Sequence, residues 1–169
     1  MSSKSAKLGS VGNPVRLSAV RVVRCSPADV EKLLCTLPPE RIASVPKHIK
    51  LEILENREGV VSYKRTLGRR TTLLEYRRTS PTEITMRTES RGGGKPIGAV
   101  MEAKLTYMPE GDSTLLRWES ALWGTRWWDA WLLRWSPRMV RRNFERTVDD
   151  VAKTLGEDHS GGPSENPVA

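Results

Sequence analysis

Six consecutive segments with a period of two restrict the fold of this chain more than any other feature of its sequence. They cover residues 49–55, 59–67, 71–79, 82–89, 97–108 and 113–123, and short turns that contain Gly, Pro or Asn separate them. Alternation of apolar and polar residues is typical of strands that bury one face. Because short turns join strands that run in opposite directions, the series predicts an antiparallel meander.

The inward face of this meander is clearest in its last two segments. Apolar side chains occupy every second position there, and charged residues such as Glu102, Lys104 and Arg117 lie between them. The predicted inward positions are Met101, Ala103, Leu105, Tyr107, Thr114, Leu116, Trp118, Ser120 and Leu122. A sheet with one apolar face needs another element to cover that face.

Helices are predicted on both sides of the meander. After a β-branched segment at 15–24, Ser26-Pro27 supplies an N-cap and a first helical proline, and apolar residues recur at helical spacing until Pro38. A short amphipathic turn follows at 40–45. Ser136-Pro137 opens a longer helix of about 19 residues that is expected to end at Gly156 and to cover the sheet. These elements predict an α+β domain at 14–156 between flexible tails at 1–13 and 157–169.

Charge and composition narrow the class of protein. The 169 residues carry a formal net charge of +8, which favours anionic partners such as acidic lipid, acidic protein or nucleic acid. Arg126, Asp129 and Arg134 interrupt the most apolar stretch, so no membrane-spanning helix is expected. The N-terminus lacks the apolar centre of a secretory signal, which predicts a cytoplasmic protein. Cys25 and Cys35 are expected to be buried thiols, and neither a metal nor a cofactor is predicted.

Groups that could carry out chemistry are few in this sequence. His48 is the one histidine within the expected domain, and its neighbours Pro46 and Lys47 indicate a loop. The run Gly92-Gly93-Gly94-Lys95 lacks the following Ser or Thr of a nucleotide-binding loop, so it predicts a turn. The sequence therefore provides weak support for an enzymatic activity.

The order of elements and several short motifs resemble one known group of proteins. A strand, a long and a short helix, six strands and a long terminal helix form the order found in START-like, helix-grip folds. Within the polyketide cyclase and lipid transport superfamily (SRPBCC), the motifs resemble the G-subunit family of carbon monoxide dehydrogenase. The resembling stretches are 26–37, Pro39-Glu40-Arg41-Ile42-Ala43, Val45-Pro46, Gly92-Gly93-Gly94, Gly98, 103–107, 111–118 and Gly124. The segment 127–135 departs from that family, in which it is usually rich in glycine and leucine.

This resemblance implies a curved antiparallel sheet of about seven strands wrapped around the terminal helix, with a cavity between them for a hydrophobic molecule. Lipids, quinones and polyketides are among the ligands of the superfamily. The implied role is that of a carrier or accessory protein, with a redox complex as one partner, and the alternative is a cyclase or dehydratase enzyme. The predicted cavity residues are Met86, Met101, Leu105, Tyr107, Leu116, Trp118, Leu122, Val140, Phe144 and Val148.

All six tryptophans of the chain fall within residues 118–135. Trp118 and Trp123 belong to the last predicted strand, whereas the other four follow it. These four either pack against the terminal helix, line the mouth of the cavity, or lie at a membrane interface with arginines that reach anionic headgroups. The last two interpretations are compatible. The predicted portal or membrane-contact residues are Trp127, Trp128, Trp131, Trp135, Arg134 and Arg138, and Arg126, Arg141 and Arg142 lie nearby.

Further arginines follow the predicted strands of the meander. They suit either a nucleic acid backbone or cross-strand ion pairs, because Glu75, Glu83 and Glu89 are interleaved with them. We favour ion pairs, since Tyr63 and Tyr76 are the only rings on these strands that could stack with bases. The arginines in question are Arg69, Arg70, Arg77, Arg78, Arg87 and Arg91.

Overall fold

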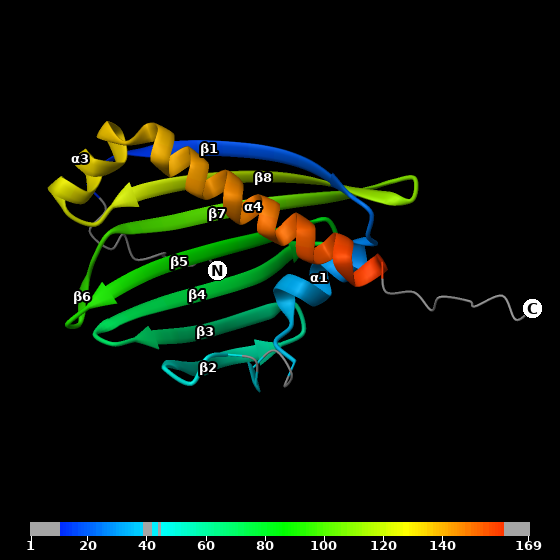
Figure 1. Ribbon diagram of the computed structural model, residues 1–169, viewed down its shortest axis with the longest axis horizontal. Coiled ribbons are helices and arrows are strands. Elements are labelled where there is room, and N and C mark those ends of the chain that lie inside the picture. The colour runs from blue at the N-terminus through cyan, green and yellow to red at the C-terminus, as the bar shows by residue number, and fades with distance from the viewer. Residues whose placement is uncertain (1–10, 39–41, 44, 161–169) are drawn as a thin grey trace, which may run out of the picture.

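A single curved sheet with one long helix across it forms the computed structural model of this protein (Figure 1). The structure describes residues 11–38, 42, 43 and 45–160. The strands are β1 (Val11–Val23), β2 (Ile49–Arg57), β3 (Val60–Leu67), β4 (Arg70–Ser80), β5 (Glu83–Gly92), β6 (Lys95–Pro96), β7 (Ala99–Glu110) and β8 (Ser113–Gly124). The helices are α1 (Pro27–Cys35), α3 (Trp127–Trp135) and α4 (Pro137–Ser160). Half of the short turn predicted at 40–45, namely residues 40, 41 and 44, lies outside the described residues.

The sheet is an antiparallel meander, except that the first strand pairs with the last one. Its strand order is β1-β8-β7-β5-β4-β3-β2, and the two-residue strand β6 pairs with β5 off this path. The first strand therefore joins the sheet next to the last one. The α+β class and the curved sheet predicted from the sequence are confirmed, while the predicted segment 97–108 begins only at Ala99 as β7, after Gly98, whose φ is +72°.

Irregular pairing interrupts both edges of the sheet. The register of β1 on β8 shifts between Val11 and Val15, and the register of β2 on β3 shifts between Ile53 and Glu55. Both shifts are of the kind that β-bulges produce. The edge strands are thus bent near one end of β1 and in the middle of β2.

Alternation along the strands separates an inner face, which α4 covers, from an outer face. On β7 and β8 the predicted inward positions Ala103, Leu105, Tyr107, Leu116 and Trp118 are buried, whereas most charged residues between them are exposed. The core joins this inner face to Phe144, Val148 and Leu155 of α4 and to Val30 and Leu34 of α1. Cys25 and Cys35 are free and buried, as predicted.

Both helix starts predicted from the sequence are observed. Ser26 and Asp29 form a capping box at the start of α1, with Pro27 as its first residue, and α4 begins at Pro137. α4 runs 24 residues to Ser160 and so passes the expected end at Gly156. A glycine inside a helix costs only about 1 kcal/mol relative to alanine, and the buried Leu155 fixes the preceding turn. β1 likewise begins at Val11, before the expected domain boundary.

Candidate functional site

An apolar pocket lies between the inner face of the sheet and the first half of α4. Its volume is about 360 Å³, near the lower end of the range for small-molecule sites. β7 and β8 supply the floor, α4 supplies the roof, and Leu133 of α3 closes one end. The lining residues are Met101, Trp118, Leu122, Leu133, Met139, Val140, Asn143, Phe144, Thr147 and Val148.

No charged side chain belongs to this lining among the residues that the structure describes. Two lining residues are polar, and the hydroxyl of one of them, Thr147, donates a hydrogen bond to the carbonyl oxygen of Asn143 at 3.0 Å. Burial of an ion here would remove its water without supplying an opposite charge. The pocket therefore suits a neutral, largely apolar molecule.

Six of the ten predicted cavity residues line this pocket together: Met101, Trp118, Leu122, Val140, Phe144 and Val148. Four lining residues were missed by the sequence reasoning. Asn143 and Thr147 lie one helical turn after Val140 and Asn143 respectively, so the helical period could have identified them. Leu133 and Met139 depend on how α3 folds back, which no pattern in the sequence indicates.

The other four predicted cavity residues lie outside the pocket. Leu105, Tyr107 and Leu116 are buried in the core, and Met86 lies beside Ala103 on the inner face of β5. Alternation identifies an inward position, but whether this position is core or cavity depends on where α4 crosses the sheet.

Tyr107 belongs to a polar network that joins α1 to the sheet. Its hydroxyl donates a hydrogen bond to Glu31 Oε1 of α1 at 2.8 Å, and the second oxygen of Glu31 pairs with Arg78 of β4. Burial first, and then the nearby Glu31 carboxylate, raise the pKa of Tyr107. Burial likewise raises the pKa of Cys35 to about 11. Both oxygens of Glu31 are thus engaged in holding α1.

The segment after β8 turns tightly into α3. A Cβ atom at Gly124 would lie 2.2 Å from the backbone nitrogen of Ala130, so only glycine permits this approach. The hydroxyl of Thr125 donates a hydrogen bond to Asp129 at 3.0 Å, and the amide of Thr125 donates to the carbonyl oxygen of Gly98. These contacts fix the orientation of α3 on the end of the sheet.

The four tryptophans of α3 point away from the protein. Trp127, Trp131 and Trp135 are 69%, 50% and 71% exposed, and Trp128 is also exposed, whereas Trp118 in β8 is buried. Their rings contact one another in pairs, 127 with 128 and 131 with 135, and Arg126 stacks over Trp128. Burial of these four rings against the terminal helix, one of the three interpretations from the sequence, is therefore not observed. Arg134 and Arg138 are exposed beside them.

Comparisons with known proteins agree on the architecture. No family model matches the sequence, and no curated protein matches it either. Among solved structures, Ara h 8.0201 is similar with a TM-score of 0.61 at 13% identity, over 88% of this chain and 99% of that one. Norcoclaurine synthase from Thalictrum flavum, in complex with dopamine and hydroxybenzaldehyde, has a TM-score of 0.56 at 13% identity over 89% and 90% of the two chains. A conserved protein from Geobacillus kaustophilus has a TM-score of 0.57 at 14% identity, over 85% and 94%.

The chain has the helix-grip fold. At these identities the likeness establishes the architecture, and the narrower resemblance to the carbon monoxide dehydrogenase family stays a prediction. The apolar pocket lies between the sheet and the gripped helix, where the resemblance implies a cavity.

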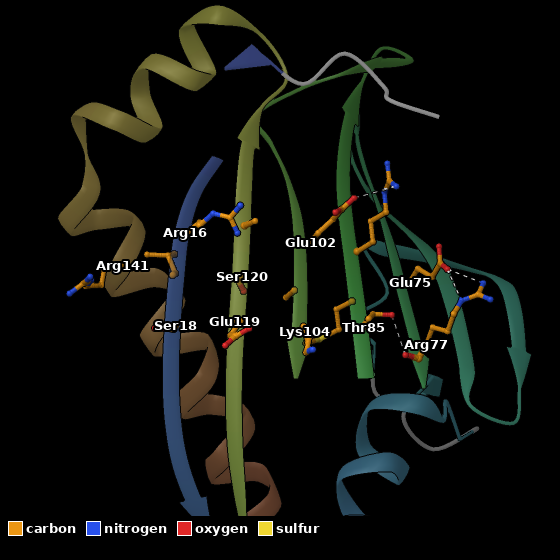
Figure 2. Close-up of a pocket in the computed structure, with 15 residues that line it drawn as sticks. Arg16, Ser18, Glu75, Arg77, Thr85, Glu102, Lys104, Glu119, Ser120 and Arg141 are labelled. Carbon is orange, nitrogen blue, oxygen red and sulfur yellow. Dashed lines mark hydrogen bonds and ion pairs between the residues drawn. The ribbon is translucent and has the colours of Figure 1, made fainter. Parts of the chain in front are cut away.

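A second and larger hollow, about 960 Å³, lies on the outer face of the helix-grip sheet (Figure 2). Two cross-strand rows form its floor, in which the small side chains of Ser18, Thr85 and Ala121 lie among charged ones. The rows are Arg16-Ala121-Glu102-Arg87-Glu75 and Ser18-Glu119-Lys104-Thr85-Arg77.

Ion pairs account for most of the charges along these strands. Glu75 pairs with Arg77 at 3.1 Å, Glu83 with Lys104 at 2.7 Å, Glu89 with Arg91 at 2.8 Å and Arg87 with Glu102 at 3.5 Å. The cross-strand ion pairs expected from the interleaved charges are present at Glu83–Lys104 and Arg87–Glu102, whereas Glu75–Arg77 and Glu89–Arg91 join residues of the same strand. His48 is exposed in the turn before β2 and lines neither of the hollows described above.

Proposed function

We propose that this protein binds a neutral hydrophobic small molecule in its apolar pocket and acts as a carrier or accessory protein for it. The observation that carries the proposal is the lining, which combines ten mostly apolar side chains with no charge among the described residues. A ligand that buries about 300 Å² of apolar surface gains roughly 7 kcal/mol before ordering costs, at about 25 cal/mol per Å². Such a gain supports micromolar affinity without an ionic contact.

The uncharged lining and the volume of the pocket limit the classes of ligand that fit it. Among the ligand classes expected from the resemblance, a quinone ring or a single-chain lipid with a neutral head fits both. The hydroxyl of Ser120 is buried and has no hydrogen-bond partner among the described residues, but Ser120 is not one of the residues that line this pocket.

Ligand titration followed by tryptophan emission tests this proposal. The four α3 tryptophans are first replaced with Phe, so that Trp118 in the pocket and Trp123 report. We expect saturable changes with menadione and with 1-decanol, and weaker binding of decanoate because its carboxylate would be buried without a counter-ion.

Two matched substitutions localise that binding. Val140→Phe fills the pocket from α4 and should lower affinity about tenfold or more, since the ligand and the added ring compete for the same space. Val22→Phe adds the same ring at an exposed position of β1 and should leave affinity unchanged. If neither menadione nor 1-decanol binds saturably, or if both variants bind alike, the proposal fails.

A cyclase or dehydratase enzyme is the alternative that the resemblance implies. Such chemistry requires an acid or base beside the ligand. The polar groups in the pocket lining are an amide and a hydroxyl, and the carboxylate that contacts Tyr107, that of Glu31, is held by Tyr107 and Arg78. We therefore prefer the carrier.

A carrier of an apolar molecule must collect it from a lipid phase, which favours peripheral association with a membrane. No helix in the described part of the chain is both long and apolar enough to cross a bilayer. The cytoplasmic location and a redox complex as a partner remain predictions from the sequence.

A further inference from the structure

The polarity of α3 is inverted relative to an ordinary surface helix. With 3.6 residues per turn, Trp127, Trp131 and Trp135 share one side, and Trp128 and Leu132 extend it. All five are exposed. The opposite side holds Asp129, Ala130 and Leu133, which are half-buried against the protein. A surface helix normally turns its apolar side inward. The exposed apolar side of α3 is therefore a candidate surface for contact with another molecule or with a membrane.

We propose that α3 docks the protein on an anionic lipid bilayer, with its indole rings in the headgroup region. The proposal deepens the proposed function, because it names the membrane from which the pocket would take its ligand. Only the exchange of a ligand rests on that function, whereas the docking itself does not. Tryptophan is enriched at membrane interfaces, since its ring is apolar and its N–H needs a polar partner. Four indoles on one short helix match this environment.

The charges around α3 select an anionic surface. Arg138, Arg141 and Arg142 occupy the first two turns of α4, whose first turn holds no acidic residue, and none of the three forms an ion pair with a described residue. Positive charge near a helix N-terminus is unfavourable, so these arginines do not serve the stability of α4. Arg126 and Arg134 add two charges at the ends of α3. An arginine beside an anionic membrane contributes about fivefold to binding.

Docking by this face would place the pocket against the lipid. Leu133 of α3 and Met139, in the first turn of α4, both line the pocket, and the side chain of Met139 is also exposed. The bend between α3 and α4 at Ser136 thus joins the docking face to one end of the pocket. A ligand could pass between them without crossing water.

Flotation with vesicles tests the docking. The intact chain should float with vesicles of phosphatidylcholine and phosphatidylserine and stay unbound with phosphatidylcholine alone. The variant Trp127→Ala/Trp131→Ala/Trp135→Ala should lose about tenfold or more of its partitioning. Arg138→Gln/Arg141→Gln/Arg142→Gln should lose roughly a hundredfold at low salt. The replaced side chains are exposed, so circular dichroism should report an intact fold.

Two control variants carry the same kinds of change elsewhere on the surface. Val20→Ala/Val22→Ala/Met108→Ala removes exposed apolar side chains from the outer face of β1 and β7. Lys50→Gln/Arg65→Gln/Arg69→Gln removes three exposed charges near β2 and β3. Both controls should float like the intact chain.

Several outcomes would overturn the docking. These are absence of flotation, equal flotation of intact chain and tryptophan variant, and equal binding to neutral and anionic vesicles. A dimer in sedimentation that the tryptophan variant abolishes, without vesicle binding, would instead assign this face to a second copy of the chain. Menadione titration without vesicles separates this result from the proposed function, because the tryptophan variant should still bind the ligand and Val140→Phe should still float.

Discussion

Gly124 is the residue on which the placement of α3 depends most directly. It combines the last position of β8 with a backbone approach to Ala130 that leaves no room for a side chain. The hydrogen bond between Thr125 and Asp129 spans the same turn. The absence of a side chain at Gly124 therefore permits the position that α3 takes at the end of β8.

We predict that Gly124→Ala destabilises the protein by about 2 kcal/mol, because the new methyl group would clash with backbone atoms that cannot move without shifting α3. Urea unfolding measures the free energy. The change should come with lower vesicle binding, since the tryptophans would be displaced. An unfolding free energy equal to that of the original chain would contradict the close approach.

Individual residues also show where sequence reasoning succeeds. Alternation assigns Met101, Trp118 and Leu122 to the inward face, and they lie there, because the period of a strand fixes the side of each residue. It assigns Leu105 and Tyr107 to the same face correctly, but these two do not line the pocket. Their neighbours across the interface, in α1 and α4, are set by tertiary packing that no local period encodes.

At the scale of elements, helix starts are predictable and helix ends are not. Ser-Pro pairs mark the starts of α1 and α4 through local capping chemistry, which depends on adjacent residues alone. Gly156 suggests an end to α4, yet the helix continues to Ser160. The orientation of α3 is equally hidden in the sequence, because it depends on the contact between Gly124 and Ala130.

The continuation of α4 through Gly156 leads to a stabilising substitution. A Cβ atom at Gly156 would meet only Val23 Cγ1, at an ordinary contact distance of 3.9 Å. We predict that Gly156→Ala raises the free energy of unfolding by about 0.5 to 1 kcal/mol, because alanine loses less backbone entropy in a helix.

Thermal unfolding checks this prediction, with Gly111→Ala as its comparison. Gly111 has a φ of +61° in the turn between β7 and β8, so alanine there should lower the melting temperature although the space is open. A lower melting temperature for Gly156→Ala would show that the helix ends before this residue.

At the scale of the whole molecule, the ligand should act on global stability. The pocket is formed jointly by β7, β8, α3 and α4, so the unfolded chain has no equivalent site. At a ligand concentration about one hundred times Kd, binding adds about 2.7 kcal/mol, which corresponds to a rise of several degrees in Tm for a domain of this size.

Differential scanning calorimetry with saturating 1-decanol measures this rise. The Val140→Phe variant should show little or no shift, while Val22→Phe should shift like the original chain. Equal shifts in all three proteins would mean that the ligand acts outside the pocket.

The interrupted edges of the sheet have a consequence for the behaviour of the protein at high concentration. An open sheet offers unpaired backbone groups along β1 and β2, which invite strands of other molecules to add. The register shifts at Val11–Val15 and Ile53–Glu55 bend each edge, and Pro14 lies within the first of them. A straight incoming strand cannot pair along either full length, so the native fold resists growth into fibrils by edge addition.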